Sequence, residues 1–122
     1  AKLCTDHYGA VGGLYWTKGE GTGQPMIYGN PKEMLNFQPQ IPLPDKVQEC
    51  NGLGMGFTLF RLDLFRDDSI ERPWFKSVQS ATEGQGTQDL YWFGKMRRAG
   101  YRVASDNRVR VGHYAYDEDR VY

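Results

Sequence analysis

The sequence Thr87-Gln88-Asp89-Leu90-Tyr91-Trp92-Phe93 starts a helix and places a carboxylate in its first turn. Thr87 is a favourable N-cap because its hydroxyl can accept a hydrogen bond from an early backbone N–H, and the helix dipole favours the negative charge of Asp89. Apolar residues then recur at helical spacing, basic residues follow, and Gly100 is typical of a left-handed stop. This pattern predicts a helix over residues 88–99.

The segment after this helix predicts two short strands that end beside a histidine. Residues 101–104 are typical of a strand, and Ser105-Asp106-Asn107 is typical of a turn. Residues 108–111 alternate polar and apolar side chains with a period of two. We therefore expect His113 and Asp89 at the ends of neighbouring elements.

The rest of the chain predicts short strands joined by long loops. Between Ile70 and Gly86, only Pro73-Trp74-Phe75 is expected to be anchored, and Glu83-Gly84-Gln85-Gly86 is expected to be mobile. The other expected elements are a buried strand at 10–16, a hairpin arm at 25–28, an extended crossing at 36–45, a strand at 47–50, an apolar segment at 57–60 and a short helix from about residue 62. The fold class is thus α/β or α+β, with a small mixed, mainly antiparallel sheet and one well-formed helix. We expect residues 1–122 to form a single, partial domain.

Composition limits the function classes. The chain has 122 residues, of which 39% are hydrophobic and 15 are glycine, so a modest core and many loops are expected. Fifteen basic residues balance fifteen acidic ones, which argues against nucleic acid as a partner. No apolar run approaches the roughly 20 residues that cross a bilayer, so no transmembrane segment is expected. The first residue is not methionine, which fits either a cut from a longer protein or removal of methionine before Ala1.

Cys4 and Cys50 carry little information about the compartment. They lack CxxC spacing and have no neighbouring cysteine or histidine at a zinc-ligand spacing. Pairing in an oxidising compartment is possible for two cysteines, but isolated thiols are more often reduced. We expect reduced thiols and a cytoplasmic setting.

Several short motifs follow one another in a fixed order: Gly54-Met55-Gly56-Phe57-Thr58-Leu59-Phe60-Arg61, Arg72-Pro73-Trp74-Phe75, residues 87–93, Ala99-Gly100-Tyr101-Arg102-Val103 and Val111-Gly112-His113. In this order they resemble glycosyltransferases of the GT-A fold. The pattern is most similar to the large, family 2-like inverting group that includes cellulose and chitin synthase-type enzymes and many bacterial and phage sugar transferases. The resemblance covers roughly residues 10–113.

This resemblance implies a role for each matching position. Asp89 matches the general base that acts on the acceptor hydroxyl, and Gln88 stands where the family commonly has glutamate. His113 matches a histidine that completes the coordination of a divalent cation, Mn²⁺ or Mg²⁺, on the donor's diphosphate. The remaining matches are to substrate-binding positions: Gly54, Met55 and Gly56 beside the transferred sugar, and Trp74 and Trp92 on the acceptor side.

The resemblance also implies that part of the enzyme is missing. GT-A enzymes bind the nucleotide in an N-terminal α/β half with a DxD motif, and nothing before Ala10 matches that half. Asp117-Glu118-Asp119 spells DxD but follows His113, and its charges are typical of a solvated C-terminus. The chain is therefore expected to be an acceptor-side half. Its parent would use a nucleotide sugar donor and a hydroxyl acceptor, while the isolated chain would be inactive and would bind the cation poorly.

Two alternatives stay open at the level of function. One is a non-catalytic carbohydrate-binding or interaction module, and the other is a fragment that is active only with a separate nucleotide-binding chain. Each motif also has a structural interpretation: Asp89 as a first-turn acid, His113 as a satisfied structural histidine, the glycines as a tight turn, and the tryptophans as core or rim residues.

Overall fold

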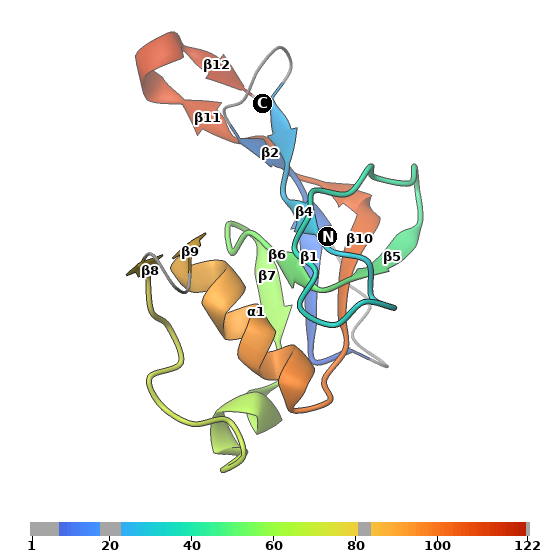
Figure 1. The fold of residues 1–122 in the computed structure, drawn as a ribbon. Helices are drawn as coiled ribbons and strands as arrows, with labels where there is room; N and C mark the ends of the chain where they lie inside the picture. Colours follow the sequence, from blue (N-terminus) through green and yellow to red (C-terminus); the bar gives the residue numbers. More distant parts are fainter. Residues whose placement is uncertain (1–7, 18–22, 81–83, 122) are drawn as a thin grey trace.

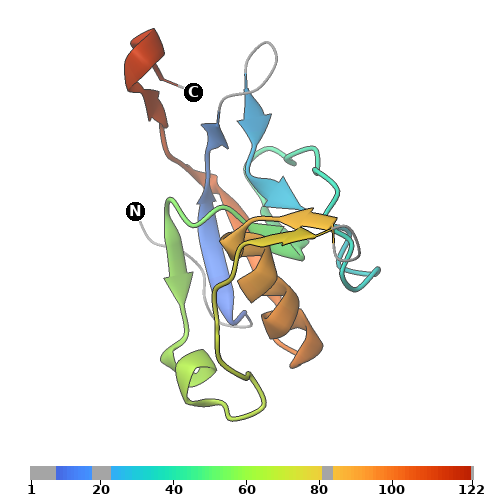
Figure 2. The same cartoon turned by 60° about the vertical axis from the view of Figure 1, so that its left-hand side comes forward.

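The computed structural model describes residues 8–17, 23–80 and 84–121. Its centre is a four-stranded sheet with the order β5-β10-β1-β7. Strands β1 (Ala10–Leu14) and β10 (Val103–Arg110) run parallel, whereas β7 (Thr58–Phe60) and β5 (Val47–Cys50) pair antiparallel with them on the outer sides. Helix α1 (Gln88–Arg98) packs against this sheet (Figures 1 and 2). The predicted fold class, a small mixed and mainly antiparallel sheet with one helix and loops, is confirmed.

Smaller elements surround the sheet. The hairpin of β11 and β12 extends away from the main sheet (Figure 1). The short antiparallel pairs are β2 (Trp16–Thr17) with β3 (Gln24–Pro25), β4 (Ile27–Tyr28) with β6 (Gly52–Leu53), β8 (Val78–Ser80) with β9 (Gly84–Gly86), and β11 (Tyr114–Ala115) with β12 (Arg120–Val121). Two 3-10 helices complete the described chain, η1 (Leu62–Arg66) and η2 (Tyr116–Glu118).

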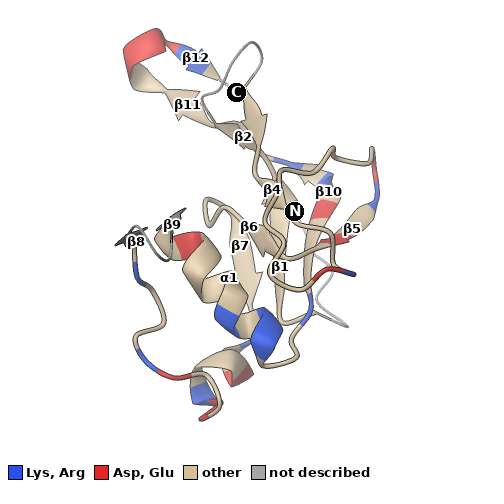
Figure 3. Cartoon of the chain, viewed as in Figure 1, with Lys and Arg blue, Asp and Glu red and all other residues tan. Residues whose placement is uncertain are grey.

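Helix α1 has the ends that its sequence predicts. The Thr87 hydroxyl accepts a hydrogen bond from the Leu90 N–H at 3.5 Å, and Gly100 adopts a φ of +94° just beyond the last turn. An acidic residue lies in the first turn and three basic residues lie in the last turn, and Figure 3 shows the two charges at opposite ends of the helix. This arrangement complements the helix dipole. The observed helix ends one residue before the predicted boundary, because Ala99 is its C-cap.

The core joins one side of α1 to the sheet. Phe93 and Met96 from the helix are fully buried with Val103 of β10 and Ala10 of β1. An aromatic cluster extends this core toward η1, and its members are Phe60, Phe65, Trp74, Phe75 and Trp92. Burying aromatic side chains in this way supplies much of the stabilisation available to so small a domain.

The prediction of a turn at residues 105–107 is wrong, because β10 continues through them. Ser105, Asp106 and Asn107 are buried between β5 and β1. Their polar groups have partners there: the Asn107 amide donates to the Leu43 carbonyl at 2.9 Å, and Asp106 forms an ion pair with Arg108 at 2.8 Å. The register with β1 shifts after Asp106, so a bulge replaces the expected turn. Turn-forming side chains are compatible with a strand when its neighbours satisfy them.

The described parts of the segment from Ile70 to Gly86 contain secondary structure that the sequence analysis did not predict. Ile70 is buried beside the aromatic cluster, and β8 and β9 form a hairpin in which Ser80 pairs with Gly84. Gly84-Gln85-Gly86, expected to be mobile, forms β9, while Glu83 lies outside the described residues. Glycines carry no side-chain signal for a strand, yet their backbone groups pair like those of any residue.

The other sequence predictions hold with small changes. Residues 10–16 divide into β1 and β2 at Tyr15, and the arm expected at 25–28 pairs partly with β2 and partly with β6. The segment 36–45 contains no helix and crosses extended, with a bridge between Tyr28 and Pro39. Within the described residues, the model contains no helix of the length and apolar character needed to span a bilayer.

Candidate functional site

The two parallel strands of the sheet end side by side. Leu14, the last residue of β1, lies opposite Arg110, the last residue of β10. Whatever follows these strands therefore gathers at one edge: Tyr15 and Trp16 after β1, and His113 after β10. The carboxyl ends of parallel strands are the usual place for ligands in open α/β sheets.

His113 is attached to this edge through β2. Its Nδ1 lies 3.1 Å from the Trp16 carbonyl oxygen, and its ring packs edge-on against Tyr15 with 6.2 Å between centroids. A carbonyl accepts, so Nδ1 carries the proton in this contact and Nε2 stays available to accept or to ligate. His113 is half-buried, which keeps one side of the ring open.

Asp89 approaches the same edge from the first turn of α1. Its Oδ2 lies 3.4 Å from the backbone nitrogen of Met55, in the loop Gly54-Met55-Gly56. The carboxylate is half-buried. The structure thus brings together two features that the sequence analysis had selected separately, the helix-start acid and the glycine loop.

Tyr15 connects the glycine loop to His113. The Gly56 N–H donates to the Tyr15 hydroxyl at 2.9 Å, and the Tyr15 ring makes a T-shaped contact with His113. A Cβ on Gly56 would stand 2.8 Å from the phenol ring, and one on Gly54 would collide with the hydroxyl. Both glycines are therefore required by the close approach of Tyr15, and not by a positive φ.

Two tyrosines give this site its electrostatic character. Burial raises the pKa of Tyr15 above its ordinary value of 10.0; the Gly56 N–H opposes that rise and the charge of Asp89 adds to it. The pKa of Tyr28 is also raised, first by burial and then by the charges of Tyr15 and Asp89. Both phenols consequently stay protonated at neutral pH, beside a carboxylate. Sequence reasoning missed both tyrosines, although Tyr15 lies within the buried strand predicted at 10–16.

The tryptophans selected from the sequence belong to the core and its margin. Trp92 is 0% exposed, and its ring stacks on Phe65 at 5.2 Å between centroids. The expectation that Trp92 lines an acceptor surface is therefore wrong in this structure, because the helix turns its indole inward. Trp74 is half-buried, with Phe65 at 5.1 Å and the Arg72 guanidinium 4.9 Å from its ring. Gln88 is exposed at the first residue of α1.

The described residues do not by themselves form a site for a divalent cation. Within them, no three side chains of histidine, cysteine, aspartate or glutamate gather at one place. Mg²⁺ and Mn²⁺ prefer several oxygen ligands, whereas His113 offers a single nitrogen. Asp117, Glu118 and Asp119 lie at η2 and its C-cap in the β11–β12 hairpin, where the Asp119 carboxylate accepts a hydrogen bond from the Tyr114 hydroxyl at 2.6 Å. Their position agrees with a structural and solvated role.

Comparison with known proteins finds a solved structure with a similar fold but does not identify a family. No family model matches the chain, and no curated protein matches it. Among solved structures, the crystal structure of A197 from STIV is similar, with a TM-score of 0.57 and 20% sequence identity. The match covers 93% of this chain but 50% of A197, so the chain spans half the length of that protein. At this identity the similarity concerns the fold alone.

Proposed function

We propose that this chain is the acceptor-side half of a GT-A-type glycosyltransferase and that Asp89 is its general base. The observation that carries the proposal is the meeting of residues distant in sequence: Asp89, the Gly54-Met55-Gly56 loop, Tyr15 and His113 lie along one edge of the sheet. That edge lies where the two parallel strands end. The resemblance of the motifs and the meeting of their residues are independent arguments for the same site.

The chemistry assigned to Asp89 is proton acceptance. The acceptor oxygen forms a bond to the anomeric carbon of the donor sugar, the bond from that carbon to the diphosphate breaks, and its electron pair leaves with the diphosphate. The proton of the acceptor hydroxyl passes to a carboxylate oxygen of Asp89, so charge and atoms balance. A negative charge at a helix N-terminus is favoured by the dipole, which supports the deprotonated form that a base requires.

The neighbours of Asp89 are assigned positioning roles. The Met55 N–H holds one carboxylate oxygen, and the Tyr15 hydroxyl accepts from Gly56, which fixes the loop against the strand end. A protonated Tyr15 keeps its own O–H for donation toward a bound sugar oxygen or toward Asp89. A fixed carboxylate and loop reduce the cost of orienting the acceptor.

The nucleotide-binding half, the cation and the compartment belong to the proposal as well. His113 would add one ligand to a Mn²⁺ or Mg²⁺ ion held mainly by the diphosphate and by carboxylates outside the described residues. The nucleotide sugar donor would be bound by a half outside this chain. A cytoplasmic setting agrees with Cys50, whose thiol is free and fully buried, and burial raises its pKa to about 12. Such a thiol is unreactive.

The decisive experiment measures transfer by the protein that contains this chain together with a donor half. Nucleotide sugars and hydroxyl acceptors are screened with Mn²⁺, comparing wild type with Asp89→Asn and His113→Ala. Replacing the base is expected to lower kcat by about 10²–10⁴-fold. Asp63→Asn removes an exposed carboxylate in η1 and serves as the matched control, with activity unchanged. Full activity in Asp89→Asn would show that the base is another group.

The isolated chain separates the half-domain proposal from its alternatives. Calorimetric titration with nucleotide sugars and Mn²⁺ is expected to give no tight binding, and a micromolar site would contradict a missing donor half. If transfer appears only when a separately expressed donor half is added, the chain is a fragment of a two-chain enzyme. Saccharide binding without transfer in any such mixture would instead favour a non-catalytic module.

A further inference from the structure

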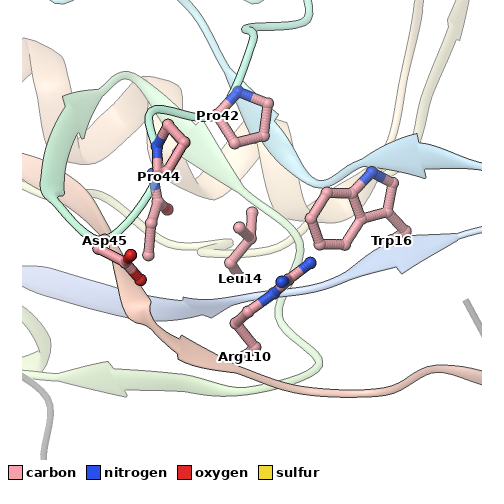
Figure 4. A pocket seen from close by; sticks show the side chains of 7 residues that line it. Leu14, Trp16, Pro42, Pro44, Asp45 and Arg110 are labelled. Carbon is pink, nitrogen blue, oxygen red and sulfur yellow. The ribbon is translucent and has the colours of Figure 1, made fainter.

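A pocket lies beside Trp16, the first residue of β2. Tyr15, the Gly54-Met55-Gly56 loop and Asp89 are not among the residues that line it. The pocket beside Trp16 has a volume of about 290 Å³. Six of the residues that line it are labelled in Figure 4: Leu14, Trp16, Pro42, Pro44, Asp45 and Arg110.

Strand pairing and hydrogen bonds fix several of the residues that line this pocket. Leu14 and Arg110 are the paired last residues of β1 and β10, and Leu14 is only 5% exposed. Asn107 forms part of the wall, and its amide nitrogen donates to the Leu43 carbonyl and to Gln48, which fixes the extended crossing in place. The two prolines have restricted backbones. The pocket is therefore preformed and needs little ordering when a ligand binds.

The polar groups of the pocket are available to a ligand. The Arg110 guanidinium lies 5.4 Å from the centre of the Trp16 ring, and this cation–π contact is its one interaction with the described part of the chain. The Asp45 carboxylate makes no hydrogen bond or ion pair with residues 8–17, 23–80 or 84–121. Figure 4 shows Trp16 and Asp45 at opposite ends, with Arg110 and Leu14 between them.

These features match the chemistry of a sugar ring. A pyranose has an apolar C–H face that stacks on an indole, and hydroxyls at its edge that both donate and accept hydrogen bonds. Asp45 accepts from hydroxyls and Arg110 donates to them. The opposite charges cancel, which disfavours a phosphate or another anion. Small-molecule pockets range over roughly 300–1,000 Å³, so this pocket is at the lower limit and suits a single ring better than a nucleotide sugar.

We propose that the pocket between Trp16 and Asp45 is a saccharide-binding site that holds one neutral sugar ring. The argument uses only the lining of this pocket and does not depend on Asp89 as a base. If the chain is also the acceptor half of a transferase, the site would hold a sugar unit other than the one that reacts, since neither Asp89 nor Tyr15 lines this pocket.

The test uses ¹H–¹⁵N spectra of the 122-residue chain and follows the indole N–H of Trp16 and the Nε–H of Arg110. Glucose, galactose, mannose, N-acetylglucosamine and their disaccharides are titrated, together with glucuronate and inorganic phosphate. At least one neutral sugar is expected to shift both signals saturably, with a millimolar Kd. The indole signal of buried Trp92 reports that the fold is intact in every sample.

Variants decide whether the shift belongs to this pocket. Trp16→Ala and Asp45→Asn are each expected to weaken binding by about tenfold or more, and Trp16→Phe by less because it keeps an aromatic face. Tyr116→Ala is the matched control, because Tyr116 is 87% exposed on η2, and it should leave the Kd unchanged. Asp89→Asn should also leave the Kd unchanged.

Four results would overturn the proposal. The first is the absence of a saturable shift with every neutral sugar, and the second is binding that survives both Trp16→Ala and Asp45→Asn. The third is a response to phosphate or glucuronate without a response to neutral sugars, which would identify an anion site. Loss of binding in Asp89→Asn would place the ligand at Asp89 and outside this pocket, and would also contradict it. None of these outcomes depends on transfer, so failure here leaves the role of Asp89 to be judged by the activity assay.

Discussion

The two ends of α1 differ in how completely their polar groups are satisfied. Near the C-terminus, the Arg97 guanidinium donates to the Asn51 side chain at 2.9 Å and to the carbonyls of Tyr101 and Pro31 at 3.1 Å. At the N-terminus, Asp89 has a single long contact with the Met55 N–H, at 3.4 Å, within the described residues. The C-terminal end of α1 is held by several hydrogen bonds, whereas the N-terminal end keeps a carboxylate that can bind a ligand.

The difference shows where this domain obtains its specificity of fold. Asn51 is 0% exposed, and its amide nitrogen donates to the carbonyls of Asn30, Glu33 and Asn36, each at 2.9 Å. Together with Arg97 it attaches the loop of residues 30–36 to the helix. A buried polar network that is fully satisfied specifies a unique arrangement, whereas an under-bonded charge at a strand edge is more typical of a functional site.

The largest effect is expected from Asn51→Ala. The substitution removes the hydrogen bonds from the Asn51 amide to the three loop carbonyls and also removes the acceptor of the Arg97 guanidinium. Each hydrogen bond contributes about 0.5–1.5 kcal/mol, so the free energy of unfolding should fall by about 3–4 kcal/mol. Urea unfolding followed by circular dichroism measures this change. Asn51→Asp is the informative companion, because it keeps the shape and the bond to Arg97 but loses the donors. If Asn51→Asp proves as stable as wild type, the amide donors are not what holds the loop.

A smaller loss is expected from Arg97→Ala. It removes three hydrogen bonds, but Arg97 is half-buried and water can replace part of them, so the free energy of unfolding should fall by about 1.5–2.5 kcal/mol. Arg98→Ala removes the same kind of charge from the same helical turn, at an exposed position, and should change stability by about 0.5 kcal/mol or less. Equal losses of stability in the two variants would mean that the stabilisation comes from the positive charge at the end of the helix and not from the hydrogen bonds of Arg97.

Local patterns were sufficient to predict much of the fold. The capping threonine, helical periodicity and terminal glycine predicted α1 almost to its ends, and the strand at Val47–Cys50 was predicted with its observed bounds. Helix capping and the period-two pattern act over a few residues, so a single sequence contains them. The family resemblance selected Asp89 and residues 54–56 separately, and the hydrogen bond from the Met55 N–H to Asp89 joins them in the structure.

Interactions between distant segments could not be predicted in the same way. Asn51 lies in a loop-like stretch, and nothing nearby in the sequence indicates that its partners are Arg97 and three carbonyls of the 30–36 loop. Tyr15 accepts a hydrogen bond from Gly56, which lies 41 positions away in the sequence. The inward turn of Trp92 follows from which face of α1 packs on the sheet. Such features depend on tertiary packing, which overrides local composition.

The raised pKa of Tyr15 predicts that the stability of the fold decreases at alkaline pH. The pKa of Tyr15 is raised in the folded state, so its contribution to stability is fully present below pH 10 and is lost as the pH rises through the folded value. Because Tyr15 is only partly buried, we expect a loss of roughly 0.5 kcal/mol per pH unit above pH 10. Urea unfolding of wild type and Tyr15→Phe between pH 9 and 11 measures the difference in slope, and Tyr116→Phe is the exposed control. A slope unchanged by Tyr15→Phe would contradict the raised pKa.

The smallest effect on stability is expected from Asp89→Asn, which is the sharpest test of the contrast between the two helix ends. The variant loses an attractive charge at the helix N-terminus, worth about 0.3–1 kcal/mol at low salt and less at moderate salt, but asparagine still accepts the Met55 N–H. The net change in the free energy of unfolding should therefore stay within about 0.5 kcal/mol. Urea unfolding at low and at moderate salt separates the two contributions, since salt screens the charge and leaves the hydrogen bond. A loss as large as that of Arg97→Ala would make Asp89 a structural residue, and its position at the strand edge would then say nothing about catalysis.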